Sequence, residues 1–186
     1  MKNTNHTLKA FLSGIAWLLL LDTCSAFGEA PREPPATIAH FDVSRPNANI
    51  QSEIKISEHR SYQFHLYVLY NGGEEQAKIQ ELVGGWGRKK GDSKFGSHGV
   101  VIPIHFFISD SSGKVIEDAT HYTQGSNIHG FSGAKEGYYA RYISSADLKP
   151  GLYKIEINTV QATPEFNNVS CAIHIGWRPN TRPIKD

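Results

Sequence analysis

One stretch of the chain concentrates residues that could bind a charged partner. Residues 84–99, GGWGRKKGDSKFGSHG, hold six glycines and four basic side chains around one tryptophan. A nucleotide-binding phosphate loop follows a strand, opens a helix and carries its lysine directly after its last glycine. Here a helix is predicted before the glycines and a strand after them. We therefore predict that this stretch does not bind nucleotides.

The same stretch has the composition of a contact loop. Trp86 would be the apolar anchor, because a single aromatic residue often carries most of the energy of an interface. The basic rim would consist of Arg88, Lys89, Lys90 and Lys94, which with Asp92 leave a local formal charge of +3. This charge favours an acidic protein partner. The alternative is a solvated connection without a role.

Histidines are the other residues that could do chemistry. His65, His105 and His174 each fall on the outward face of a predicted strand. Zinc requires three or four ligands at about 2.1 Å from one point. Strand adjacency cannot be deduced from the sequence, and histidines on an outward face are usually surface residues, so we predict no metal centre and no cofactor. His98, His121 and His129 form a second, looser set to which the same argument applies.

Catalytic patterns are absent from the sequence. It contains no GxSxG elbow and no HExxH motif, and its carboxylates have no pairing that the sequence can justify. Cys171 lies on the apolar face of a predicted strand, where a thiol is usually inert packing. We therefore predict that the protein is not an enzyme, and an enzyme of the bacterial envelope is the weakest alternative.

The first residues indicate export. Lysines without acids, the apolar run of residues 10–21 and small residues after it have the layout of a secretory signal, which we assign to residues 1–26. The apolar run is shorter than the roughly 20 residues of a transmembrane helix. Anchoring through a lipid on Cys24 is the alternative. The proline-rich residues 27–37 are predicted to form an extended tether. We expect the protein to be periplasmic or lipid-anchored, and to contact a membrane only if it is anchored through Cys24.

The composition of the mature chain excludes one class of binding partner. Residues 1–26 contain two of the 19 basic and one of the 18 acidic residues, so 17 of each remain and the formal net charge is zero. No overall field would attract nucleic acid. The remaining length suits one domain, residues 38–178, followed by a C-terminal tail, residues 179–186.

Apolar residues alternate with polar ones through most of this domain. The period of two marks strands over 61–70, 100–109, 151–160 and 169–177, with weaker strands near 38–43, 49–56, 115–122 and 138–144. Helical spacing and a terminal glycine predict one helix from Glu74 to Gly84. About eight strands and one short helix predict an all-β fold, a two-layer antiparallel sandwich of immunoglobulin-like or jelly-roll-like type. The alternation predicts a core of Phe64, Leu66, Ile102, Ile104, Phe106, Ile155, Ile157, Ile173 and Ile175.

Pro103 limits where the strand over 100–109 can lie in a sheet. Proline cannot donate a hydrogen bond to a neighbouring strand. We therefore predict that this strand lies at the edge of a sheet or carries a bulge at Pro103.

The order of these segments resembles a known family. The succession HFDVSRPN, IQELVGG, VIPIHFFI, LKPGLYKIEI and CAIHIGW is similar to exported bacterial β-sandwich proteins described only as a domain of unknown function. The resemblance covers about residues 38–178. It implies a sandwich fold in the bacterial envelope and brings no catalytic residues.

The strand order places the candidate site. If each strand crosses the sandwich once, the connections at 44–48, 71–99, 123–137 and 162–168 share one end, where they would present His129, Phe131 and Phe166 beside the basic stretch. Long connections and binding residues commonly occur together on loops. We predict a protein-binding module, such as an immunity or accessory protein. The alternative is a glycan or small-ligand module in which Trp86, Tyr67 and Tyr138 are stacking rings.

Overall fold

A computed structural model describes residues 39–85, 98–126, 128–131, 136–177 and 182–184. For Ile128 and Phe131 it describes the backbone alone. The predicted signal peptide with Cys24, the predicted tether and most of the predicted tail lie outside these residues. Within the described ranges, no helix is long and apolar enough to cross a membrane.

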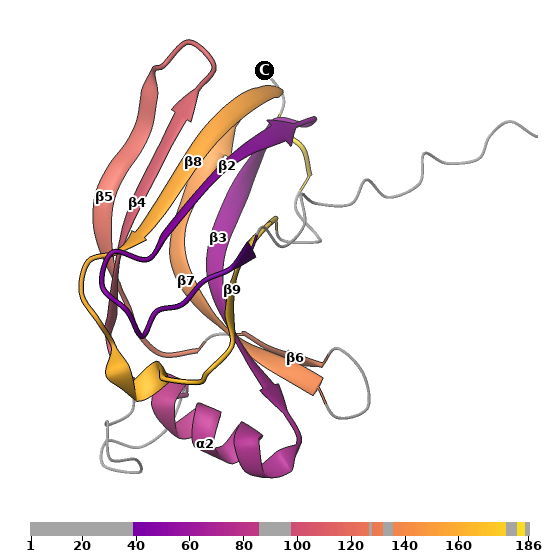
Figure 1. The fold of residues 1–186 in the computed structure, drawn as a ribbon. Coiled ribbons are helices and arrows are strands. Elements are labelled where there is room, and N and C mark those ends of the chain that lie inside the picture. The colour runs from indigo at the N-terminus through magenta and orange to yellow at the C-terminus, as the bar shows by residue number, and fades with distance from the viewer. Residues whose placement is uncertain (1–38, 86–97, 127, 132–135, 178–181, 185–186) are drawn as a thin grey trace, which may run out of the picture. The chain divides into compact units, whose positions relative to one another are not determined.

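The described strands form the two antiparallel sheets of a sandwich, as predicted (Figure 1). The first sheet has the order β1-β9-β3-β7-β6. Its strands are β1 (Ala39–His40), β9 (Cys171–Gly176), β3 (Arg60–Asn71), β7 (Glu136–Leu148) and β6 (Ile128–Phe131). The second sheet has the order β2-β8-β4-β5. Its strands are β2 (Asn49–Ile56), β8 (Gly151–Thr159), β4 (Ile102–Asp110) and β5 (Val115–Thr123).

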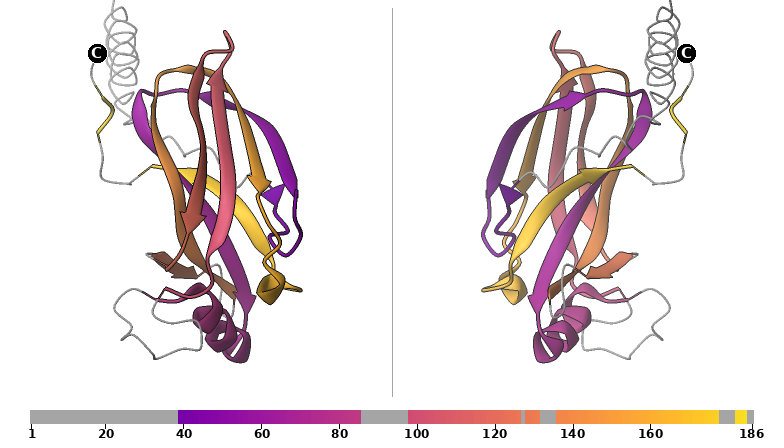
Figure 2. Two further views of the ribbon diagram at one scale, coloured as in Figure 1. Left: turned by 90° about the vertical axis from the view of Figure 1, so that its left-hand side faces the viewer. Right: turned by 90° about the vertical axis from the view of Figure 1, so that its right-hand side faces the viewer.

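Alternation along the strands builds the core between the two layers (Figure 2). Apolar side chains at every second position of a strand point to one face, where they are removed from water. All nine core residues predicted from the sequence are buried. Phe64 of one sheet meets Phe106 of the other, with ring centroids 4.6 Å apart. The faces of β3, β4, β8 and β9 were therefore predictable from their patterns.

The one α-helix among the described residues is α2 (Gly73–Val83), close to the predicted range. It buries Ile79, Leu82 and Val83, and the Gly84 N–H donates to the Gln80 carbonyl where the helix ends. Helix α2, strand β6 and the 3-10 helix η1 (Pro164–Phe166) lie at the same end of the sandwich (Figure 1). This arrangement agrees with the predicted grouping of the long connections.

Hydrogen bonds between the connections confirm that they meet there. The Gly125 N–H donates to the His98 carbonyl at 2.7 Å, and the Thr163 N–H to the Val43 carbonyl at 3.2 Å. The opposite end carries the short turns between β2 and β3, β4 and β5, and β7 and β8 (Figure 1). We call the first end the long-loop end.

The prediction for Pro103 was wrong. Strand β4 lies inside its sheet, between β8 and β5, and its pairing shifts at Ile108/Ser109 instead. Pro103 is the second residue of β4, and its carbonyl accepts from Val160, one residue beyond the end of β8. The regular pairing of β4 with β8 ends at Ile104 and Thr159, one residue before Pro103 is reached. Proline therefore lacks an N–H only beyond the end of this pairing, which is why it is tolerated in an inner strand.

Candidate functional site

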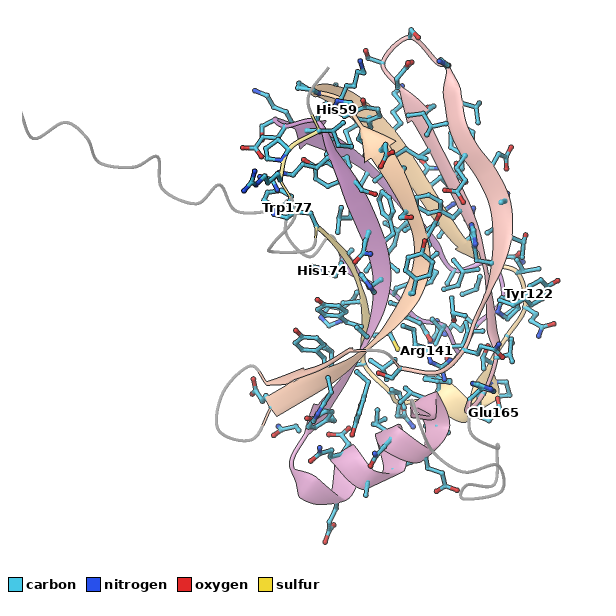
Figure 3. All side chains as sticks on the ribbon, turned by 180° about the vertical axis from the view of Figure 1, so that it is seen from behind. His59, Tyr122, Arg141, Glu165, His174 and Trp177 are labelled. Carbon is cyan, nitrogen blue, oxygen red and sulfur yellow. The ribbon has the colours of Figure 1, made fainter. Side chains whose placement is uncertain are left out.

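A buried arginine organises the long-loop end. Arg141 of β7 is fully buried, and its guanidinium donates to the carbonyls of Leu82, Val83 and Val100 at 3.1, 2.7 and 2.6 Å (Figure 3). Two of these carbonyls belong to the last turn of α2, where carbonyls lack helical partners and a positive charge is favourable. Val100 follows the glycine-rich stretch. One side chain thus holds the two described ends of the segment that carries the predicted contact residues.

Two glycines bring those ends into backbone contact. Gly84 and Gly99 have φ of +72° and +69°, in the region that favours glycine. A Cβ on Gly84 would lie 2.3 Å from the His98 carbonyl carbon, and one on Gly99 would lie 2.3 Å from the Leu82 oxygen. The Val100 N–H donates to the same Leu82 oxygen at 2.8 Å. The chain therefore leaves the sandwich at Gly84 and returns beside it at Gly99.

The surroundings of Arg141 are apolar. Its guanidinium carbon lies 5.6 Å from the ring centroid of Phe166, and Cys171 is buried close by. Burial lowers the pKa of Arg141 to about 10, which leaves it charged at neutral pH. Burial also raises the pKa of the Cys171 thiol to about 12, so the thiol stays protonated and unreactive. Phe166 was predicted to be exposed, which is wrong, because its ring packs into this buried cluster.

Most of the predicted binding residues fall in segments that the structure does not describe. Trp86, Arg88, Lys89, Lys90 and Lys94 lie outside the described residues, and the side chain of Phe131 is not described.

His129 is described and lies at the long-loop end. Its Nε2 is hydrogen-bonded to the Tyr70 hydroxyl and lies 3.3 Å from Gln76 Nε2, and its ring stacks on Tyr139 at 4.6 Å. It joins β6 to β3, β7 and α2.

A second candidate surface is a row of stacked rings on the outer face of the first sheet. Tyr67 of β3 lies between Tyr138 of β7 and His174 of β9, with centroids 4.2 and 4.5 Å away and interplanar angles of 7° and 8°. Gly130 of β6 makes room for Tyr138, because a Cβ there would lie 2.4 Å from its ring. Each ring covers the face of the next, so the row presents ring edges and hydroxyls to solvent.

The histidines divide between the two sheets. His65 and His174 are directly opposite each other on β3 and β9, whereas His105 lies in the second sheet with Nε2 2.8 Å from an oxygen of Asp118. The prediction that His65 is a surface residue was wrong, since it is only 5% exposed. Tyr67 and Tyr142 pack around it, with ring centroids 6.5 and 6.0 Å away.

His65 and His174 favour the neutral form. Burial, together with the neighbouring His174, lowers the pKa of His65 to about 4. Burial also lowers the pKa of His174, whose buried Nδ1 has no hydrogen-bond partner in the structure. Within the described ranges, no three His, Cys, Asp or Glu side chains gather closely enough to hold a metal ion.

A polar cluster that the sequence did not reveal connects the two sheets. The Ser144 hydroxyl of β7 approaches both oxygens of Glu117 of β5 at 2.6 and 2.8 Å, and His121 Nε2 lies 2.6 Å from the same carboxylate. In a catalytic triad the serine contacts the histidine, and the acid contacts the other ring nitrogen. Here serine and histidine share the carboxylate, so the arrangement does not activate the serine.

The fold and site thus define a two-layer β-sandwich whose long-loop end is organised around a buried cation. The chain belongs to the DUF5625 family, a domain of unknown function, whose model matches residues 39–177. A crystal structure of a protein from Sulfurospirillum deleyianum is similar, with a TM-score of 0.60 and 21% identity over 79% of this chain and 98% of that one. At that identity the likeness shows the fold alone. Comparison with curated proteins gives no match.

Proposed function

We propose that the protein is a non-enzymatic binding module of the bacterial envelope whose long-loop end captures a protein partner. The observation that carries this proposal is the clamp formed by Arg141, which holds Leu82, Val83 and Val100 together with one guanidinium. Binding residues are commonly presented by loops on a rigid scaffold. A buried cation placed at the base of one long connection makes its attachment rigid. The partner would be a toxin or a secretion component, as for an immunity or accessory protein.

The charge of the long-loop end indicates the charge of the partner surface that would bind it. Helix α2 contributes Glu74, Glu75 and Glu81 against Lys78 alone. Most of the positive charge at this end would therefore come from residues 88–94, where four basic residues face one acid. A partner with an acidic surface would meet these basic side chains and Trp86, and α2 would repel it elsewhere, which favours one orientation.

The stacked rings weigh against the glycan alternative. Sugars bind aromatic platforms through open ring faces, and Tyr67 has both of its faces covered by Tyr138 and His174. The exposed ring edges and hydroxyls are better suited to hydrogen bonding than to stacking. We therefore keep the glycan function as the second candidate, resting on Trp86 only.

The intact mass of the protein tests whether it is exported and processed. We expect the exported protein to lack residues 1–26, or to begin at a lipid-modified Cys24. Intact-mass spectrometry of protein isolated from the envelope distinguishes these two forms. A native N-terminus at Met1 would remove the envelope from the proposal.

Partner binding is tested by removing the basic rim. Changing Arg88, Lys89 and Lys90 together to Ala should leave the melting temperature within a degree or two of the wild type, because Lys and Arg side chains seldom belong to a core and their replacement usually changes stability little. Affinity for the partner should fall about tenfold, since exposed charges contribute roughly 0.5 kcal/mol each. The loss should shrink at high salt, where screening already weakens the wild type.

The partner would be captured from envelope extract, identified by mass spectrometry, purified and titrated by calorimetry at two salt concentrations. Changing Lys114, Lys154 and Arg182 to Ala is the matched control, because these are exposed basic residues outside the long-loop end. Equal binding by the two triple variants would leave residues 88–94 as a solvated connection.

A further inference from the structure

The four edge strands of the two sheets differ in how much unpaired backbone they expose. Strand β1 has two residues and β6 has four, which offers little to an incoming strand. Strand β5 is held against β7 through Glu117 and Ser144. Strand β2 is eight residues long, regular and free of proline, and among the described residues it pairs with β8 alone. Such an edge is a template for pairing with another chain.

The backbone of β2 offers alternate residues to that open edge. The Thr159 N–H of β8 donates to the Ala48 carbonyl, and the Ala48 N–H donates to the Thr159 hydroxyl. In an antiparallel ladder the groups of successive residues point to opposite sides. Counting from Ala48, Ile54 therefore faces β8, whereas Glu53 and Lys55 direct their N–H and C=O groups to the open edge.

The side chains of β2 match a second copy of the same strand. Ile50 and Ile54 point into the core, and Gln51, Glu53 and Lys55 are exposed on the outer face. A two-fold axis beside Ile54 places Glu53 opposite the partner's Lys55 and Lys55 opposite the partner's Glu53. Opposite charges that face each other across two strands are stabilising. The same residue pairs would exchange the new backbone hydrogen bonds.

We propose that the protein forms a symmetric dimer in which the β2 strands of two copies pair antiparallel about Ile54. The four-stranded sheets of the two copies then become one continuous sheet. Charged residues on an edge strand usually prevent such pairing. Here they do not prevent self-pairing, because in this register each charge meets its opposite. Strand β2 contains none of the residues of the basic rim, so dimerisation and partner binding can be tested with different variants.

The dimer is tested by reversing charges. In Glu53→Lys each copy presents two lysines, and in Lys55→Glu each presents two glutamates. Like charges then face each other, and the dissociation constant of each variant with itself should rise about tenfold or more. Mixed in equal amounts, the two variants restore both opposite-charge pairs and should form a heterodimer. Sedimentation velocity and native mass spectrometry measure both results.

Three further variants make the result specific. Lys78→Glu and Glu74→Lys change the net charge equally on α2 and should dimerise like the wild type. Glu53→Pro removes an N–H from the open edge without touching the ladder to β8, and should be monomeric with its fold intact by circular dichroism. The proposal is overturned if the wild type stays monomeric up to its solubility limit, or if the mixture associates no better than each variant alone.

Discussion

Replacing Arg141 by Met should destabilise the protein by about 3 kcal/mol or more. The Val83 and Val100 carbonyls lose the guanidinium that they share, and leaving a buried carbonyl without its donor costs roughly 1–3 kcal/mol. The Leu82 oxygen keeps the Val100 N–H. A loss of that size is a large part of the roughly 5–15 kcal/mol that stabilises an ordinary domain.

Two effects oppose each other at this position. Burying a guanidinium is unfavourable, as its lowered pKa shows, and replacing a buried charge by an apolar side chain of similar volume sometimes stabilises a protein. We expect the hydrogen bonds to dominate, because the residue has three carbonyl partners that no other described side chain reaches. Methionine fills much of the volume of arginine, so a loss in Arg141→Met is not caused by a cavity.

Chemical denaturation measures the total loss, and hydrogen exchange locates it. The Gly84 and Val100 amides, which donate to Gln80 and Leu82, should exchange faster in Arg141→Met than amides in the middle of β3. Arg45→Met is the control, because the Arg45 side chain is 80% exposed and should tolerate the change. A variant as stable as the wild type would mean that Arg141 does not hold this end together.

Acidification should reduce the stability of the wild type by about 3 kcal/mol through His65 alone. Its pKa is about 4 in the folded protein and 6.5 in the unfolded chain. Between these values the unfolded chain binds more protons, so the free energy of unfolding falls as the pH falls. The contribution is fully present above pH 6.5 and is lost by about pH 4, at about 1.4 kcal/mol for each unit of pKa difference. His174 acts in the same direction.

The measurement compares denaturation curves at pH 7 and pH 4. Carboxylates also titrate in this range, so the quantity of interest is the difference between the wild type and His65→Gln. The variant should lose about 3 kcal/mol less than the wild type on acidification. Gln80→Ala, at an exposed position of α2 that does not titrate, should lose as much as the wild type. An equal loss in all three proteins would contradict the assignment to His65.

The sequence predicted the faces of the strands better than their neighbours. Alternation depends only on the direction of successive side chains, so it identified Phe64 and Ile104 as core residues. Sheet order depends on contacts between distant segments. The pattern therefore did not reveal that His65 lies beside His174, or that His105 lies in the other sheet. Exposure of His65 was predicted wrongly for the same reason, because the rings that cover it come partly from neighbouring strands.

Ser144 of β7 was hidden by a β-bulge. Phe64 is paired with Ser144 and His65 with Tyr142, so Ile143 is an extra residue that shifts the faces of β7. Alternation across the bulge cannot assign Ser144 to the correct face. Arg141 was also overlooked because arginine is rarely buried. Its place in the run YYARYI, two residues from each of the buried side chains Tyr139 and Ile143, is the signal that was available.

The contact between Gly84 and Gly99 also makes this fold suited to loop exchange. The entropic cost of closing a connection grows slowly with its length, by about 0.6 kcal/mol for each doubling, once its two ends are fixed side by side. Peptides of different length and composition can therefore be grafted between these glycines without a change in any strand, provided that Arg141 and both glycines are kept. The sandwich then acts as a constant frame for interchangeable segments of different sequence.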